Sequence, residues 1–499
     1  MSSPLIRAAA PPDRDVRAFE WTAAALLVLA GGYLAGTGAH LYLALLLGAI
    51  ISVVALSRPG PILMAYLIYM PFEEFLLKWV PEGSAYLGLR YGPEMGLYLM
   101  LGAVIWGRAV SGRRPWFRRT PLDLPAAIFV AVALLSAVVN GTPPLLVAHG
   151  LRWLLRYLVV YYLVVHLEWS PERRRRWIGG LLAVAGLQAV IGILQSAAGK
   201  PAWDLLAADY SKRGWVTDEV KLDPNYRRGV FATMGSYFAL GTFLSLWITV
   251  ALAQFWSTAR RRWLAAAAFL AVGLFLSYSR QAALGLMIAA LALAWMFGRR
   301  ALIAGVLIVV LLYLGAGAWV FLTDTYIPGS NIDRPVHERF LGPFTREYWR
   351  IDYTFRGRSY LLFDVGGRLL RDAPLLGEGP GMFGTQASLT YGSPVYQRLK
   401  IDPRNLFDVY WVDVLGQVGL LGVLAFLGLL WGAGRAAWRR AREASDPGER
   451  GLALAVAALV LAVSVACFFG PSLSDRYLSL YLWTLVGMIA APRPERESA

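Results

Sequence analysis

Runs of about twenty apolar residues dominate this sequence and limit its fold more than any other feature. About fourteen of them can be traced, roughly at 21–38, 40–57, 61–77, 92–108, 122–139, 151–168, 177–197, 233–256, 263–278, 281–298, 301–322, 409–433, 451–470 and 475–491. A helix of about twenty residues crosses the roughly 30 Å of hydrocarbon in a bilayer. The chain is 57% hydrophobic and only 16% charged, whereas soluble domains are about 25% charged. The sequence therefore predicts an all-α integral membrane protein with about fourteen transmembrane helices.

The net charge of +16 follows the expected membrane topology and does not indicate a nucleic-acid partner. The basic residues gather in alternate short connections, at 7–17, 58, 108–119, 173–176, 260–262, 299–300, 435–450 and 493–496. Cytoplasmic loops of membrane proteins carry such an excess of arginine and lysine. The alternation places both termini in the cytoplasm, with residues 1–20 and 492–499 as short tails and the lipid bilayer as the surrounding partner.

Two connections on the opposite face are long. One lies near 199–232, within the first eleven helices at 21–322, and the other occupies 323–408, before the last three helices at 409–491. A loop of about 85 residues is too long for a simple connector and should contain structure of its own. We expect an amphipathic helix over 358–372 at the membrane surface, ended by Pro374 and Gly377. Its apolar stripe consists of Leu361, Leu362, Val365 and Leu369, and its polar stripe of Asp364, Arg368 and Arg371.

A glycine-rich segment, Gly377-Glu-Gly-Pro-Gly381, follows this expected helix. It resembles a dinucleotide-binding loop, but such a loop would follow a strand. We interpret it as a tight turn that brings backbone N–H groups close to a ligand or to the membrane surface. The sequence contains no phosphate-binding GxxxxGK motif, and its four histidines are scattered. We therefore expect neither a cofactor nor a metal site.

Arg152 and Arg156 lie four residues apart on one face of the span at 151–168, near its outer end. A charge inside a membrane span is costly and usually faces an interior cavity or a partner. Two interpretations stay open: pairing with a carboxylate such as Glu73 or Glu74, and a site for an anion. Arg280 lies at the same outer level, and converging arginines can bind a diphosphate through two N–H groups each.

A series of short motifs follows in the rest of the chain. They are Arg228-Gly-Val-Phe231, Ser277-Tyr-Ser-Arg280, Arg358-Ser-Tyr-Leu361, Pro374-Leu-Leu-Gly-Glu-Gly-Pro-Gly-Met-Phe383, Arg404-Asn-Leu406 and Gly416-Gln-Val-Gly-Leu-Leu-Gly422. In order and spacing, over about residues 150–485, they resemble the O-antigen ligase and O-antigen polymerase superfamily. The first five spans resemble it only in being apolar.

This resemblance implies a GT-C-like helical bundle and a membrane glycosyltransferase. The implied reaction is metal-independent and inverting, and it polymerises or ligates glycan repeat units at the outer face of the bacterial inner membrane. The donor is a polyprenyl-diphosphate-linked glycan, and the acceptor is a saccharide or lipid-linked saccharide; other membrane proteins of glycan assembly could be partners. By analogy, the diphosphate is bound by arginines whose fixed charges replace a metal. The candidates are Arg152, Arg156, Arg228, Arg280 and Arg358.

The sequence departs from the family pattern at Arg404. In the ligases a histidine typically precedes the asparagine and is the proposed general base, whereas arginine cannot accept a proton near neutral pH. We expect Arg404 to bind an anion and a neighbouring carboxylate to act as the base. Asp408 is favoured because it would share a helix face with Arg404 if the span began at residue 403. The other candidates are Glu378, Asp402 and His337.

Two other function classes fit part of the pattern. A lipid-linked oligosaccharide flippase has a similar number of spans and intramembrane arginines, but it has little use for a large external cap. A non-catalytic glycan-assembly protein is favoured only if no base exists. Within the superfamily, the missing histidine and the absence of a Thr-Thr pair after the Gly416 motif favour a polymerase over a ligase.

Overall fold

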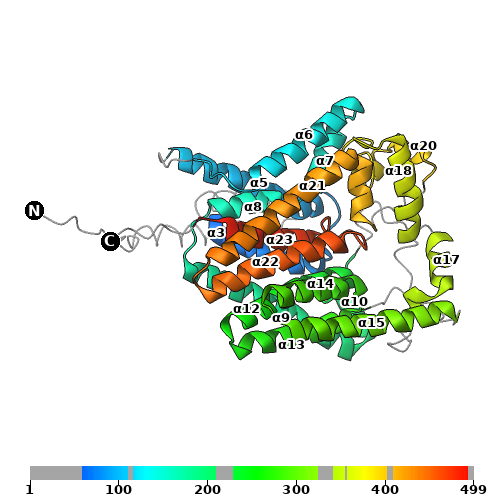
Figure 1. Ribbon diagram of the computed structural model, residues 1–499. Helices are drawn as coiled ribbons and strands as arrows, with labels where there is room; N and C mark the ends of the chain where they lie inside the picture. Colours follow the sequence, from blue (N-terminus) through cyan, green and yellow to red (C-terminus); the bar gives the residue numbers. More distant parts are fainter. Residues whose placement is uncertain are drawn as a thin grey trace, which may run out of the picture.

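The computed structural model describes residues 59–110, 116–209, 229–323, 341–354, 357–401 and 408–492. Within these ranges the fold is built from helices and contains no strand. Most helices run along one bundle, and the helices of the long connection at 323–408 gather at one end of it (Figure 1). The predicted spans at 21–38 and 40–57 lie outside the described residues.

The other predicted spans coincide with helices or pairs of helices. These are α3 (Pro59–Tyr69) with η1 (Met70–Phe72) and α4 (Glu73–Leu77), α5 (Ser84–Val110), α6 (Asp123–Val139), α7 (Pro144–Leu154) with α8 (Leu158–His166), α9 (Pro171–Ala198), α12 (Tyr237–Thr258), α13 (Arg261–Ser277), α14 (Arg280–Met296), α15 (Arg300–Leu322), α21 (Tyr410–Glu443), α22 (Pro447–Ala466) and α23 (Arg476–Ala490). A short helix, α10 (Lys200–Leu206), follows α9. In the described part, six segments are long and apolar enough to cross a membrane. They are 59–77, α9, α12, α15, α21 and α22. The chain is thus an all-helical membrane protein, and the total of about fourteen spans stays a prediction.

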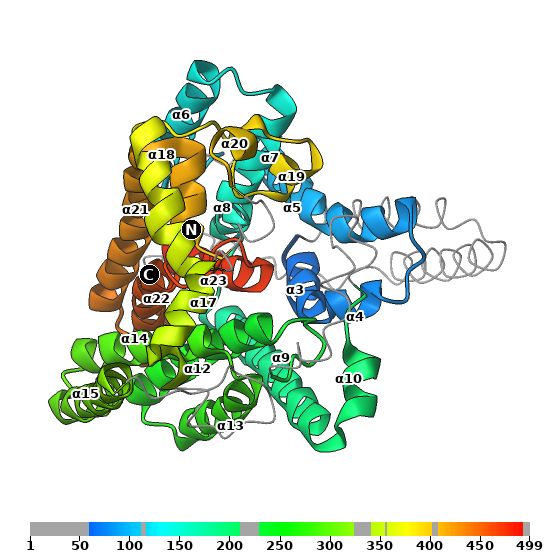
Figure 2. The same ribbon diagram turned by 90° about the vertical axis from the view of Figure 1, so that its right-hand side faces the viewer.

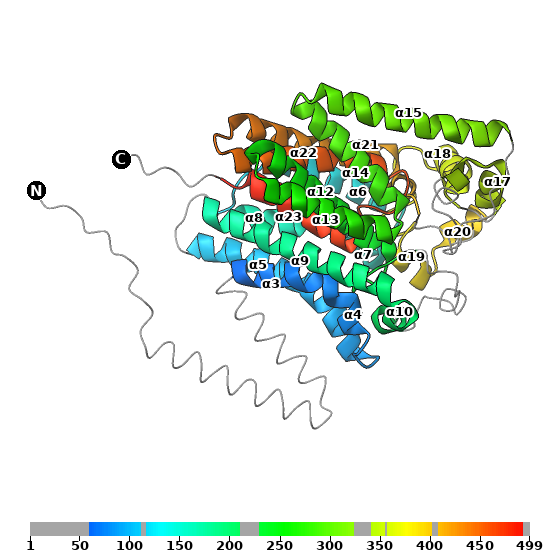
Figure 3. The ribbon, with the colours of Figure 1, turned by 90° about the horizontal axis from the view of Figure 1, so that it is seen from below.

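The centre and the edge of the bundle differ sharply in burial. Every residue from Tyr477 to Ile489 of α23 is buried, and α12 and α22 are buried around most of their circumference. By contrast, α15 buries only Gly317 and Val320 and runs along one edge of the bundle (Figure 3). A helix that is apolar on all sides belongs either in a core or in lipid. We therefore place the exposed apolar surface of α15 against the bilayer.

The predicted span at 151–168 is not one continuous helix. It breaks between α7 and α8, where Tyr157 adopts a left-handed backbone conformation with φ 61°. Such a conformation costs a non-glycine residue about 1–3 kcal/mol and persists only where the surroundings enforce it. Here Tyr157 is buried, its hydroxyl lies 3.3 Å from that of Tyr66, and the backbone carbonyl of Arg156 accepts a hydrogen bond from Ser479. The break therefore places Arg156 inside the bundle.

The described part of the 323–408 connection contains several short helices. They are η4 (Gly342–Phe344), α17 (Arg346–Thr354), η5 (Tyr360–Val365), α18 (Gly366–Asp372), α19 (Gln386–Thr390) and α20 (Pro394–Arg398). Figure 2 looks onto the end of the bundle that they occupy. The helix expected over 358–372 is present as η5 and α18, with Leu361, Val365 and Leu369 buried. This stripe packs into a second hydrophobic core with Phe383 and Tyr396, so the helix stabilises the connection itself.

Helix α21 is interrupted at Gly419, whose φ of 66° and ψ of −169° are not helical. The interruption frees the carbonyl groups of Gly416 and Gln417, which would otherwise accept hydrogen bonds within the helix. They accept instead from the backbone N–H groups of Glu378 and Gly379, at 2.8 and 3.0 Å. The glycine-rich segment therefore fills the gap in α21.

The same interruption frees two N–H groups, and these are satisfied in the same way. Leu420 donates to the carbonyl of Pro374 at 2.9 Å, and Leu421 donates to that of Leu375 at 3.1 Å. In a bilayer no water can satisfy an open backbone group, so non-helical backbone is tolerated only where protein partners supply the bonds. Residues 374–379 are these partners, and the two motifs at 374–383 and 416–422 are one structural unit.

Side chains of α6 fix the other face of this unit. The hydroxyl of Ser136 donates to the carbonyl of Leu376 at 2.5 Å, and the side-chain amide of Asn140 donates to that of Gly377 at 3.0 Å. The N–H groups of the glycine-rich segment also have partners inside the protein. Those of Glu378 and Gly379 donate to α21, and that of Gly381 donates to the side chain of Gln417 at 2.8 Å. Our expectation that these N–H groups face a ligand or the membrane surface was therefore wrong for these three residues.

We predict that Gly419→Ala disrupts the fold. An added methyl group would lie 2.3 Å from the carbonyl carbon of Leu375, in a backbone conformation that L-residues rarely adopt. The variant should lose about 1–3 kcal/mol or more of stability. Gly428→Ala in the same helix is the control, because no atom lies within 4 Å of the new methyl group. Thermal unfolding in detergent measures both; equal midpoints for the two variants would contradict the assigned backbone pairing.

Candidate functional site

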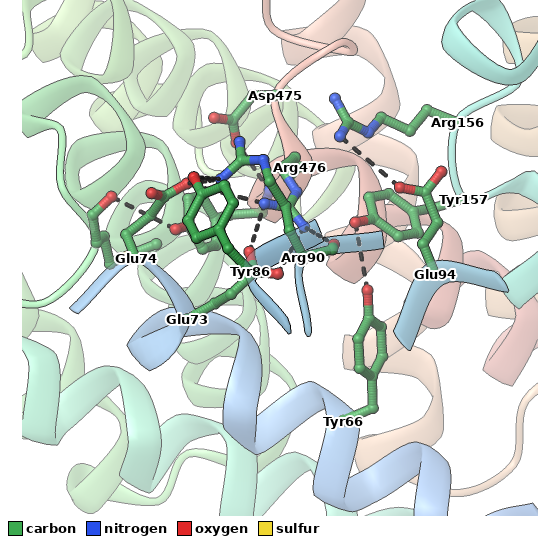
Figure 4. Close-up of polar contacts among 12 residues, drawn as sticks. Tyr66, Glu73, Glu74, Tyr86, Arg90, Glu94, Arg156, Tyr157, Asp475 and Arg476 are labelled. Atoms are coloured by element: carbon green, nitrogen blue, oxygen red, sulfur yellow. Dashed lines mark hydrogen bonds and ion pairs between the residues drawn. The ribbon is translucent and has the colours of Figure 1, made fainter. Parts of the chain in front are cut away.

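A cluster of eight charged residues lies within the bundle, near the end that carries the long connection. We call it the charged cluster; it consists of Glu73, Glu74, Arg90, Glu94, Arg152, Arg156, Asp475 and Arg476. Figure 4 shows most of these side chains pointing toward one another. They come from α4, α5, the α7–α8 break and the start of α23, which all reach this level of the bundle. Each charge can therefore be compensated without water, as a membrane interior requires.

The inner half of the cluster is balanced and closed. Arg476 donates to the fully buried Glu73 at 2.7 Å and lies 3.8 Å from Glu74. Arg90 lies 3.5 Å from Glu74. Two guanidinium groups thus face two carboxylates, and all four side chains are largely buried. A buried pair in this geometry holds the elements together but leaves no charge for a ligand.

The outer half contains two arginines and one carboxylate. Arg152 donates from Nε and Nη2 to the two oxygens of Glu94, at 2.7 and 2.6 Å. Arg156 lies 3.9 Å from Glu94, donates from Nη1 to the carbonyl of Ser474 at 2.9 Å, and has a buried Nε–H without a hydrogen-bond partner among the described residues. The side chains of Arg152 and Arg156 are 27% and 18% exposed. Asp475, the eighth member of the cluster, also acts electrostatically on Arg156, so four guanidinium groups and four carboxylates leave the whole cluster without net charge. Within ion-pair distance, however, the two outer arginines share only Glu94, and both can be reached from outside.

These contacts correct one of the two interpretations of Arg152 and Arg156. We suggested Glu73 or Glu74 as partners, but these carboxylates pair with Arg476 and Arg90. The actual partner is Glu94, ten residues into α5. Asp475 does not take its place, because its carboxylate accepts from the first N–H groups of α23.

Aromatic rings support the guanidinium groups of the outer half. Arg152 lies over the ring of Tyr91 at 5.3 Å, and Arg156 lies beside that of Tyr157 at 5.6 Å. Such contacts favour a cation most where water is excluded. They help to orient both side chains.

Helix α7 connects the outer half to the glycine-rich segment. Gly150 packs so closely against Pro380 and Gly381 that a methyl group at Gly150 would lie 2.2 Å from the Gly381 nitrogen. His149 lies 5.8 Å from the ring of Tyr391 in the long connection. Helix α7 therefore contacts the family motif through Gly150 and carries Arg152 of the candidate anion site two residues later.

Two of the candidate bases, Glu378 and Asp408, belong to the described residues and differ in their surroundings, whereas Asp402 and His337 lie outside them. Glu378 is buried and forms an ion pair with Arg398, whose side chain is 57% exposed. Asp408 is exposed, directly before α21. We expected Asp408 to share a helix face with Arg404. Because α21 begins at Tyr410, Asp408 precedes the helix and lies on no face of it. Arg404 itself lies outside the described residues.

The remaining candidate arginines are only partly placed. Arg280 is the first residue of α14 and lies 6.0 Å from the ring of Tyr348 in α17. Arg358 is half-buried just before η5. Neither forms an ion pair with a described residue, and Arg228 lies outside the described part of the chain. The structure thus brings Arg152 and Arg156 together, and among the described residues Arg280 and Arg358 make no contact with them.

One further polar group near this site is the phenol of Tyr396. Its hydroxyl accepts the N–H of Gly384 at 3.1 Å and shares a 2.5 Å hydrogen bond with Ser388. A phenol is protonated at neutral pH in any case, and burial raises the pKa of Tyr396 further, to about 12. It serves to hold the loop around residue 384 and is not a candidate base.

Sequence reasoning missed five charged residues. Arg90, Glu94, Asp475 and Arg476 complete the charged cluster, and Asp413 in the first turn of α21 is fully buried with neither carboxylate oxygen hydrogen-bonded to a described residue. All of them fall inside a predicted span or within two residues of its end. A search for every ionisable residue within the spans and at their ends would have found them.

Comparison with known protein families agrees with the motifs. Residues 265–427 match a family model described as O-antigen ligase. The match includes the motifs around Arg280, Arg358, 374–383 and 416–422, but not Arg152, Arg156 or Arg228. No curated protein matches the chain. The match over residues 265–427 supports the O-antigen ligase and O-antigen polymerase family and, in general, a membrane glycan-ligase activity.

Proposed function

We propose that this protein is a membrane glycosyltransferase that polymerises or ligates glycan repeat units from a polyprenyl-diphosphate donor. One observation carries the proposal: two partly exposed arginines share a single carboxylate at ion-pair distance, and the buried Nε–H of Arg156 has no hydrogen-bond partner among the described residues. Helix α7, which carries Arg152, also packs against the glycine-rich family motif. A diphosphate supplies negative charge to both arginines and a hydrogen-bond acceptor to Arg156.

The proposed reaction is a single displacement that inverts the anomeric carbon. The acceptor hydroxyl oxygen forms a bond to this carbon while the bond from carbon to the diphosphate oxygen breaks. The electron pair leaves with the lipid diphosphate, which gains one negative charge. Arg152 and Arg156 stabilise this charge as it develops, in place of a metal ion. Arg228, Arg280 and Arg358 are further candidates for contact with the diphosphate or the sugar next to it.

The acceptor proton passes to a carboxylate. Asp408 is the favoured base because its side chain is exposed, whereas Glu378 is buried and paired with Arg398. A carboxylate is a weak base, but it suffices when the leaving group is good and the hydroxyl becomes acidic late in the reaction. Arg404 precedes Asp408 by four residues and is proposed to bind an anionic group of the donor or acceptor.

We place the reaction at the outer face of the bacterial inner membrane, with both termini in the cytoplasm. The arginine-rich connections at 173–176, 260–262 and 435–450 support this orientation. The charged cluster then lies at the outer ends of its helices, beneath the helices of the 323–408 connection. The lipid tail of the donor would remain in the bilayer beside the bundle.

The most direct genetic test is deletion of the gene, followed by profiling of surface glycan and lipid-linked intermediates. A polymerase predicts loss of long surface polymer and accumulation of single lipid-linked repeat units. Long polymer that is not attached to its acceptor would indicate a ligase of the same class. Intermediates trapped in the inner leaflet would contradict the proposal and favour a flippase, and complementation with the intact gene controls for secondary effects.

We predict that Arg152→Ala, Arg156→Ala and Arg280→Ala each lower the transfer rate by about 10²–10³-fold, because each removes a charge-assisted contact to the leaving group. Lysine should not restore the rate, since it cannot reproduce the planar fork of arginine. The measurement is transfer from lipid-linked donor in membranes.

The control for these variants is Arg175→Ala, because Arg175 forms an exposed ion pair with Asp446 outside the charged cluster. It should keep both rate and stability. Full activity of the Arg→Lys variants would contradict bidentate recognition. Loss of folded protein in the Ala variants, without a change in rate per folded molecule, would show that the arginines are structural.

For the base, we predict that Asp408→Asn lowers the rate by about 10²-fold or more, the usual contribution of a general base. Asp402→Asn should be far less damaging, and Arg404→His should be partly tolerated. Single-turnover transfer with purified protein measures the effect on the chemical step. A wild-type rate for Asp408→Asn would rule out this residue, and Glu378 would be the next candidate.

A further inference from the structure

The N–H edge of Arg152 that a phosphate would use is already occupied. Glu94 accepts from both Nε and Nη2, with the two-oxygen geometry that a phosphate also adopts toward arginine. The same carboxylate lies 3.9 Å from Arg156. Glu94 is itself almost fully buried, and no other guanidinium lies within ion-pair distance of it among the described residues. A diphosphate that binds both arginines must therefore compete with Glu94.

The net charge of the site shows how competition between Glu94 and the diphosphate affects the bound donor and the bound product. Arg152 and Arg156, together with Glu94 and the neighbouring Asp475, carry no net charge. A donor diphosphate with about two negative charges brings the site to about −2, and the leaving group, with a free terminal phosphate, brings it to about −3. The carboxylate therefore disfavours the product more than the donor.

We propose that Glu94 is a resident counter-ion that occupies the diphosphate site when it is empty and speeds release of the lipid diphosphate product. This inference rests on the proposed function of the outer half. Glu94 makes no contact with the reacting carbon in this account; it is a positioning residue that holds Arg152 and Arg156 in the empty state. When the donor arrives, its phosphate oxygens replace the carboxylate oxygens on Arg152, and after transfer the carboxylate returns and displaces the product.

The test is Glu94→Gln in full-length protein in lipid nanodiscs, with inorganic diphosphate as the probe. Glutamine keeps the shape of the side chain but removes its charge. The variant should bind diphosphate about tenfold or more tightly than the wild type, since one nearby negative charge is lost in a partly buried site. With lipid-linked donor, its single-turnover rate should be unchanged or higher. Its steady-state rate should fall and show a burst, because release has become slow.

The control is Glu347→Gln, which removes the same charge from an exposed ion pair with Arg350 in α17. It should change neither the affinity for diphosphate nor the burst. If Glu94→Gln does not fold, Glu94→Asp decides the question. The shorter side chain withdraws from Arg152, so affinity should rise under the proposal and fall if Glu94 only holds the arginines in a structural role.

The outcomes separate this inference from the proposed function. Wild-type transfer together with unchanged or weaker diphosphate binding by the Glu94 variants would overturn the counter-ion role and leave the glycosyltransferase intact. If the Arg152→Ala variant binds diphosphate with the same affinity as the wild type, the outer half is not the diphosphate site. Absence of transfer by the wild-type protein would contradict the proposed function itself.

Discussion

The exchange of backbone hydrogen bonds between α21 and residues 374–379 is the interaction on which the rest of the structure depends. It allows α21 to break at Gly419 without leaving open polar groups in the membrane. It also fixes the long connection to the bundle through backbone atoms, so the attachment does not rely on any one side chain. Because Gly381 then packs against Gly150, the same exchange fixes the connection to α7, the helix that carries Arg152.

The two halves of the charged cluster have different roles. The inner half, with Glu73, Glu74, Arg90 and Arg476, is balanced and joins the N-terminal helices to α23. The outer half has two partly exposed arginines that share one carboxylate, Glu94, at ion-pair distance. A rigid, neutral inner half can hold the outer arginines in place, and preorganised charge is what stabilises a leaving group most effectively. The strained Tyr157 lies at the boundary between the two halves, which agrees with the tendency of strain to gather at functional sites.

Much of the fold could be predicted from sequence, because helix length and apolar periodicity are local properties. The spans in the described part and the helix at 358–372 follow from them. The two helix breaks could not be predicted, since they depend on partners distant in the chain: 374–379 for Gly419, and Tyr66 and Ser479 for the α7–α8 break. The position of Arg152 and Arg156 in a buried site was predictable from their place in a span. Their partner was not, because α5 contributes Glu94 through tertiary packing alone.

The most direct test of the central claim is a cryo-electron microscopy structure of the protein with a polyprenyl diphosphate bound. The account predicts phosphate oxygens within hydrogen-bond distance of Arg152 and Arg156, with the Glu94 carboxylate withdrawn from Arg152. It also predicts the lipid tail in the bilayer, and the 323–408 connection over the diphosphate. A diphosphate bound at the arginine-rich connections around 260–262 or 435–450, with the Glu94–Arg152 pair intact, would contradict the account.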